Sequence, residues 1–204
     1  MRFHIMLLVA VVMSIGLSVS GGGGPAIFYM APGVFDLPTE LKVEEGFLAF
    51  GGYGYGLSKI GLVGGLGAGG EFEKGTYSYS YSMGGFWWAY PYNLDPFSVY
   101  VGAVIGGSSV SVGRTVEGEN SMIDFQNGTC PGILSISRDG WLFMPSVMVS
   151  VRVFKWLEFM VGISGMLNYF PKGWIFEDGT PVEGYEPKQF ELGYSIVLGV
   201  TWGS

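Results

Sequence analysis

Side chains with the types and spacing for acid–base chemistry are few in this chain. Arg152 and Glu158 flank the sequence Phe154-Lys155-Trp156, so a three-residue turn there puts them opposite each other on neighbouring strands. We expect an inward-facing cross-strand ion pair, with a gate or constriction as the functional alternative. Glu191 is a third inward carboxylate, but it should lie far from Glu158. The sequence therefore predicts no working pair of catalytic carboxylates.

Histidine and cysteine are too scarce for most other site chemistry. His4 is the only histidine and lies in a segment that we expect to be removed, and Cys130 is the only cysteine. Ser-His-Asp or Cys-His catalysis and imidazole metal sites all need a histidine. We therefore expect no enzymatic activity, no metal site and no cofactor.

A glycine-rich run at 65–70 fits the G-x-G-x-x-G pattern of dinucleotide sites. Such a site needs a helix immediately afterwards, whereas a Tyr/Ser alternation follows this run. We interpret the glycines as a means of close strand packing.

Strict alternation surrounds the turn between Arg152 and Glu158. Over residues 145–169, bulky apolar residues such as Val149 and Phe159 alternate with Ser, Gly, Met and Asn. Period two indicates β-strands. Small polar residues make a poor solvent face but suit a narrow lumen. The apolar face is therefore predicted to meet lipid, in a barrel whose closure pairs every backbone group.

The pattern recurs along the chain and predicts an all-β fold, a closed antiparallel up-and-down transmembrane β-barrel of about eight strands. The expected strands cover residues 26–35, 47–56, 59–72, 76–90, 97–114, 141–154, 156–169 and 188–202. Residues 133–138 are expected to form a short extension strand that ends in a turn at Asp139-Gly140. Counting 133–138 in place of 26–35 also gives eight. A parity shift near Gly107 predicts a β-bulge.

Composition and charge agree with one barrel domain. Hydrophobic residues make up 49% of the 204 residues and charged residues 13%, and there are 36 glycines. Residues 1–20 are predicted to be a signal peptide, and 21–204 a single barrel domain with long loops at about 115–140 and 170–187. Loss of Arg2 changes the net charge from −7 to about −8, which argues against nucleic acid.

Aromatic residues are expected to collect in two girdles, one at each membrane interface. The girdle at the short-turn end is predicted to contain Trp87, Trp88, Tyr90, Trp156 and Trp202. The girdle at the long-loop end is predicted to contain Trp141, Phe143, Tyr169 and Trp174.

With its signal peptide, alternating strands, girdles and final E-L-G-Y-S-I-V-L-G-V-T-W, the chain resembles the small eight-stranded outer-membrane barrels of bacteria. Members of that class usually end on an aromatic residue, whereas Gly203 and Ser204 follow Trp202 here. The glycine-rich start is also similar to a group of secreted proteins of thermophilic bacteria, which implies no activity.

The resemblance implies an outer-membrane protein with a structural or interaction role, or a very narrow pore. The expected partners are the lipid bilayer and, at the acidic loops, an extracellular partner or a cation. Two alternatives remain open, each with a secreted or periplasmic location: a soluble β-barrel that binds an apolar ligand, and a glycine-rich surface protein that self-assembles.

Overall fold

The computed structural model describes residues 21–31, 45–115 and 133–203, together with Phe35, Leu37, Leu41 and Val43. The predicted signal peptide and Cys130 lie outside these residues. In the described part, no helix is long and apolar enough to cross a membrane.

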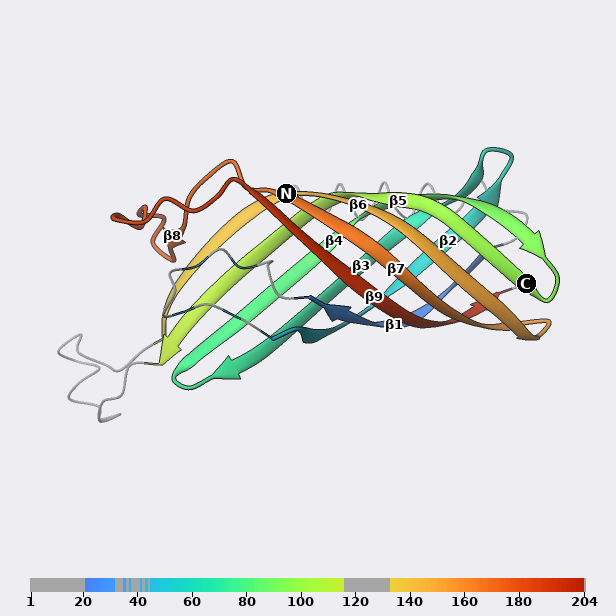
Figure 1. The fold of residues 1–204 in the computed structure, drawn as a ribbon, viewed down its shortest axis with the longest axis horizontal. Helices are drawn as coiled ribbons and strands as arrows, with labels where there is room; N and C mark the ends of the chain where they lie inside the picture. Colours follow the sequence, from blue (N-terminus) through green and yellow to red (C-terminus); the bar gives the residue numbers. More distant parts are fainter. Residues whose placement is uncertain are drawn as a thin grey trace.

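The described residues form one antiparallel sheet that closes on itself (Figure 1). Its strands are β1 (Gly21–Met30), β2 (Phe47–Ser58), β3 (Gly61–Lys74), β4 (Tyr77–Leu94), β5 (Phe97–Thr115), β6 (Ile133–Phe154), β7 (Leu157–Tyr169), β8 (Ile175–Phe176) and β9 (Phe190–Gly203). The ring runs β5-β4-β3-β2-β1-β9-β7-β6 and is closed by pairing of β5 with β6. The two-residue β8 lies outside this ring on β6. The predicted eight-stranded closed barrel is confirmed.

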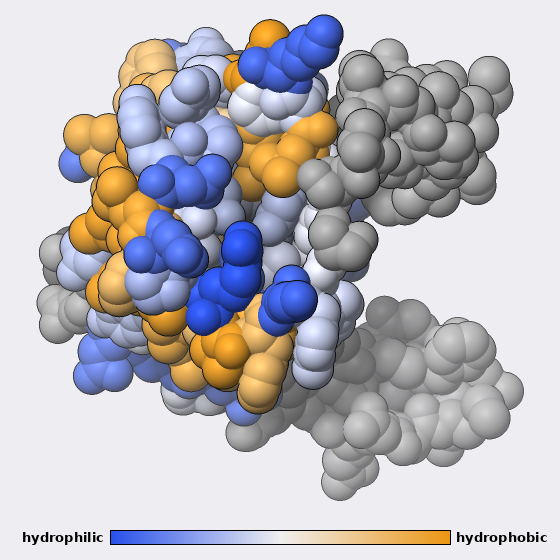
Figure 2. All heavy atoms as spheres, turned by 90° about the vertical axis from the view of Figure 1, so that its right-hand side faces the viewer, coloured by the Kyte–Doolittle hydropathy of each residue, from blue (hydrophilic) through white to orange (hydrophobic). Residues whose placement is uncertain are grey.

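The two ends of the barrel differ. The tight β2–β3, β4–β5 and β6–β7 turns lie at one end with the last residues of β9, and β8 and the long segment between β7 and β9 lie at the other (Figure 1). Seen from the short-turn end, hydrophilic residues gather at the middle and hydrophobic residues lie along the flank (Figure 2).

The apolar side chains point outward. Phe159, Ile163 and Leu198 are 51%, 57% and 56% exposed, whereas Ser164 and Ser195 are buried inside the barrel. A water-soluble protein buries such residues, because exposing them to water costs about 25 cal/mol per Å². The exterior therefore suits a hydrocarbon environment, as predicted from the alternation.

The first strand begins several residues before the predicted one. Gly21–Met30 is the strand, and Gly21 to Gly24, which lie outside the predicted range, pair with β2, while Gly22 and Gly23 also pair with β9. Glycine has a low strand propensity, so the sequence did not predict a strand over these four residues. Its pairing partners are themselves glycine-rich, which allows the backbones to approach closely.

The region 133–154 is one continuous strand, so the predicted loop up to residue 140 and the turn at Asp139-Gly140 are wrong. Gly140 pairs with Ser108, and the β5–β6 register is unbroken from Phe97↔Val151 to Thr115↔Ile133. The predicted bulge near Gly107 is wrong for the same reason.

A change of environment accounts for the parity shift on β5. Outward residues of β5 are apolar over 97–105, about the 9–11 residues that a tilted strand needs to cross a bilayer. Beyond this stretch Ser109 and Ser111 face outward, and Val110 and Val112 are buried inside. The strand thus leaves the apolar band and continues with the pattern of a protein in water.

Candidate functional site

The middle of the barrel is filled by large side chains. Those with at most 2% exposure include Trp87, Tyr79, Tyr81, Leu62, Leu142, Met144, Met148 and Met166. An eight-stranded barrel has an interior just wide enough for side chains. The described residues therefore separate the two mouths of the barrel, and each mouth forms its own site.

The short-turn mouth is a cavity of about 560 Å³ on the barrel axis. We call it the vestibule. Side chains or backbone from seven of the eight barrel strands line it: Gly21, Tyr55, Asn93, Tyr100, Arg152, Glu158 and Thr201. Its volume falls within the range of about 300–1,000 Å³ that is usual for small-molecule sites.

The structure places Arg152 and Glu158 opposite each other at the rim of the vestibule. They are register partners across β6 and β7. Nε and Nη2 of Arg152 lie 3.0 and 2.9 Å from Oε1 of Glu158. Ser150 donates a hydrogen bond of 3.0 Å to the other oxygen, Oε2. Both carboxylate oxygens are engaged, so the guanidinium group is held in a fixed position.

An aromatic cluster forms the floor of the vestibule. Tyr53 and Tyr55 are stacked with their ring planes 8° apart, and Trp87 contacts both rings edge-on. The hydroxyl groups of Tyr53 on β2 and Thr201 on β9 form a hydrogen bond inside the barrel. Of these rings only that of Tyr55 lines the vestibule, and Tyr53 and Trp87 pack behind it.

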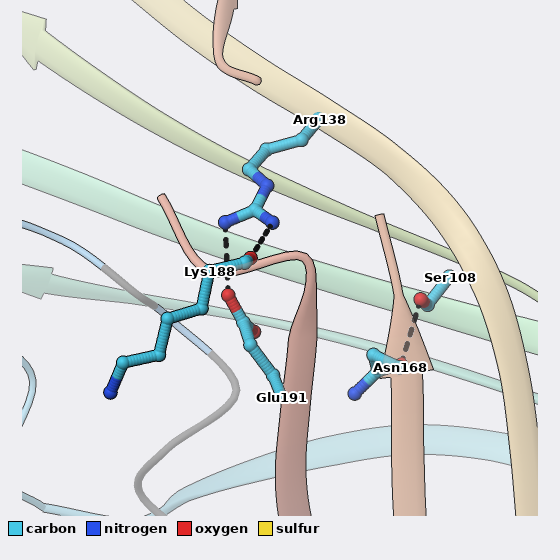
Figure 3. A network of polar contacts seen from close by, with 5 residues as sticks. All are labelled: Ser108, Arg138, Asn168, Lys188 and Glu191. Atoms are coloured by element: carbon cyan, nitrogen blue, oxygen red, sulfur yellow. Dashed lines mark hydrogen bonds and ion pairs between the residues drawn. The ribbon is translucent and has the colours of Figure 1, made fainter. Parts of the chain in front are cut away.

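A second ion pair closes the long-loop mouth, and sequence reasoning missed it. Arg138 Nη1 lies 2.9 Å from Glu191 Oε1, and Nη2 donates to the backbone carbonyl of Lys188 at 2.8 Å (Figure 3). The two side chains are 0% and 2% exposed. A carboxylate that is buried in the lumen needs a cationic partner. The predicted inward position of Glu191 could therefore have indicated a nearby arginine or lysine.

Aromatic rings cover the Arg138 guanidinium. The ring centroids of Phe170 and Trp174 lie 4.1 and 5.3 Å from its central carbon, which gives two cation–π contacts. Both rings are buried. The segment that follows β7 thus lies over the end of the barrel as a lid.

Asn168 makes a polar contact below this pair. Its Oδ1 accepts a hydrogen bond from Ser108 at 2.8 Å (Figure 3). It accepts a second one from Tyr81 at 3.3 Å. All three residues are buried, so this contact joins β4, β5 and β7 inside the barrel.

The predicted girdle residues separate into two groups. Trp88, Tyr90, Trp202, Trp141 and Phe143 are exposed on the outside, Tyr169 is half-buried there, and Trp156 is exposed in the β6–β7 turn, where it also lines the vestibule. Trp87 and Trp174 are corrections to the prediction. Trp87 is 0% exposed because it shares the inward face of β4 with Tyr79 and Tyr81, and Trp174 is 2% exposed against Arg138.

The acidic residues of the second long loop are exposed, but they do not converge. Asp178 accepts hydrogen bonds from the Thr180 backbone N–H and hydroxyl at 2.9 and 2.6 Å, and these bonds lower the pKa of its carboxyl group. Glu177 accepts one from Ser135 at 2.6 Å. Among the described residues, no three potential metal ligands of the His, Cys, Asp and Glu types come together.

The fold is that of the small eight-stranded outer-membrane β-barrels. Neisserial surface protein A aligns with a TM-score of 0.54 and 12% identity, over 92% of this chain and 98% of that one. A major outer membrane protein from Thermus thermophilus aligns with a TM-score of 0.54 and 10% identity, over 91% and 100%. No protein-family model and no curated protein sequence matches the chain. These likenesses support the fold alone.

Proposed function

We propose that this protein is an outer-membrane barrel that conducts no solutes and acts through the groups at its two ends. The filled lumen carries this proposal. Trp87, Met144, Met148 and Met166 are each at most 2% exposed between the two mouths. An open channel needs a ring of more strands, such as the 16–18 of porins. One of the two similar structures is a surface protein by name and the other an outer membrane protein, which supports an outer-membrane location here.

The apolar exterior favours this proposal over a soluble secreted barrel. Ile105, Trp141 and Leu192 are 60%, 66% and 75% exposed on the outside, where a soluble protein would place polar groups. The closed ring also argues against a protein that self-assembles edge to edge, because a closed barrel offers no free strand edge.

The orientation follows the general rule for outer-membrane barrels, with short turns in the periplasm and long loops outside. In this orientation the exposed acidic residues of the second loop, Glu177, Asp178, Glu183 and Glu186, face the exterior. Any structural or binding partner outside the cell would meet this acidic surface. The vestibule would face the periplasm.

Current recording in a planar lipid bilayer tests the proposal. The protein, inserted and folded as judged by heat-modifiable gel migration, should give no steady unitary current. A variant with Trp87→Ala and Met148→Ala removes two of the side chains that fill the lumen and should raise the current. Steady ion-conducting steps from the unmodified protein would contradict the proposal.

A further inference from the structure

The vestibule combines a closed floor with an open mouth. Tyr55 lines it and packs on Trp87, which is 0% exposed, whereas Arg152 at the rim has a side chain that is 54% exposed. A small molecule can therefore enter from the short-turn end and stop at the aromatic floor. This feature depends on the closed lumen of the proposed function.

Two polar groups of the vestibule, Arg152 and Asn93, are hydrogen-bonded to neighbouring side chains before any ligand arrives. Glu158 holds two of the three guanidinium nitrogens of Arg152, which leaves Nη1 outside the ion pair. Asn93 accepts a hydrogen bond from Ser98 at 3.0 Å through Oδ1, which fixes the orientation of its amide donors. Pre-positioned groups of this kind lose little freedom on binding.

The charges of the vestibule balance. Its lining contains two cations, Arg152 and Lys155, and two carboxylates, Asp95 and Glu158. An anion would be repelled by the carboxylates and a cation by the basic groups. An apolar ligand would remove four charged groups from water without replacing their hydrogen bonds. A neutral ligand that donates and accepts hydrogen bonds avoids each of these penalties.

Aromatic rings supply the remaining surface. Tyr55, Tyr100 and Trp156 line the cavity beside the polar groups. Such rings combine a flat apolar face with a polar edge. A sugar ring matches this combination, because it has apolar C–H faces and neighbouring hydroxyl groups that both donate and accept. Paired hydroxyls fit the fork of an arginine or the two oxygens of a carboxylate.

We propose that the vestibule binds a neutral saccharide of one or two rings. Arg152, Asn93 and Asp95 would contact its hydroxyl groups, and Tyr55, Tyr100 and Trp156 its ring faces. Glu158 acts as a positioning residue, because it holds the guanidinium of Arg152 in place.

Calorimetric titration of the full-length protein in a detergent without a sugar headgroup, such as an amine oxide, tests this inference. The probes are maltose and the β-1,4-linked dimer of N-acetylglucosamine, with sodium acetate and phosphate as anionic comparisons. We expect binding of at least one disaccharide. Arg152→Ala should weaken it about tenfold or more, since hydrogen bonds to charged groups are strong. Asn93→Ala should weaken it less, by about fivefold, because the Asn93 amide is neutral.

Arg114→Ala is the matched control, because Arg114 is an exposed β5 residue near the opposite end. This variant should bind as the unmodified protein does. Arg152→Lys keeps the positive charge but loses the planar set of N–H donors of the guanidinium group, so this variant should also bind the disaccharide more weakly. Heat-modifiable migration of every variant shows that the barrel has folded.

Three results would overturn the inference: neither disaccharide binds, binding is unchanged in Arg152→Ala, or only the anions bind. Because the titration needs no bilayer, it is independent of the current recording. Steady currents would overturn the closed lumen, and failed titrations would overturn the saccharide site.

Discussion

Breaking the Arg138–Glu191 pair at one partner should destabilise the barrel far more than breaking the Arg152–Glu158 pair. The first pair is 0% and 2% exposed, and in the second the Arg152 side chain is 54% exposed. A buried charge that loses its partner costs about 3–5 kcal/mol, whereas an exposed ion pair contributes about 0–1 kcal/mol. We expect Glu191→Gln to lower the free energy of unfolding by about 3 kcal/mol or more.

Two matched double-mutant cycles measure the difference. One combines Arg138→Met with Glu191→Gln, and the other combines Arg152→Met with Glu158→Gln. Urea unfolding in lipid vesicles, followed by tryptophan fluorescence, gives the free energy of each variant. The first double variant should recover much of the loss of its single variants, because no uncompensated charge stays buried.

Equal coupling energies for the two pairs would refute this reasoning. That result would mean that water reaches Arg138, and that Phe170 and Trp174 do not close the long-loop mouth. Additive effects at Arg138 and Glu191 would contradict the observed contact itself.

Two further predictions concern the wall of the barrel. Gly64→Ala should destabilise the protein by about 1–3 kcal/mol in the urea titration, because an added Cβ would meet the backbone oxygen of Gly54 at 2.0 Å. Gly65→Ala is the control and should be tolerated, because the nearest atom to an added Cβ at Gly65 is 3.6 Å away. Lipids brominated in their acyl chains should quench a variant that retains Trp141 alone, which is 66% exposed, but not one that retains Trp87 alone, which is 0% exposed; equal quenching would contradict the placement of Trp87.

Local sequence patterns were sufficient to predict the structure where a strand stays within the apolar band of the barrel. The alternation around Val149 and Phe159 predicted the correct outward face, and the pairing of Arg152 with Glu158 was also predicted correctly. The predicted three-residue turn is wrong, because Phe154 pairs with Leu157 across a two-residue turn and a register shift between Arg152 and Phe154 accommodates the extra residue. The outward face and the pairing both depend on neighbours within one hairpin. The period of a strand and the geometry of a turn determine them.

The prediction failed where the environment changes along a strand. Beyond the apolar band of β5 and β6 the two faces exchange character, and a single rule for apolar residues then produced a false bulge. The Asp139-Gly140 dipeptide, which is a common hairpin signal, produced a false turn. That false turn hid Arg138, which contacts Glu191 across 53 positions. Trp87 lies on the same inward face of β4 as Tyr79 and Tyr81. Adjacent residues of a strand point to opposite faces, so only one of Trp87 and Trp88 can face lipid.

The most direct test of the membrane assignment compares two neighbouring residues of β9. Ile196 is 40% exposed on the outside and Ser195 is 0% exposed inside. Nitroxide labels attached to Ile196→Cys and Ser195→Cys, each with Cys130→Ser, report collisions with oxygen, which concentrates in hydrocarbon. In lipid vesicles the label at 196 should show the higher oxygen accessibility. Higher accessibility at 195, or a label at 196 that responds mainly to a water-soluble relaxation agent, would contradict the claim that the apolar face meets lipid.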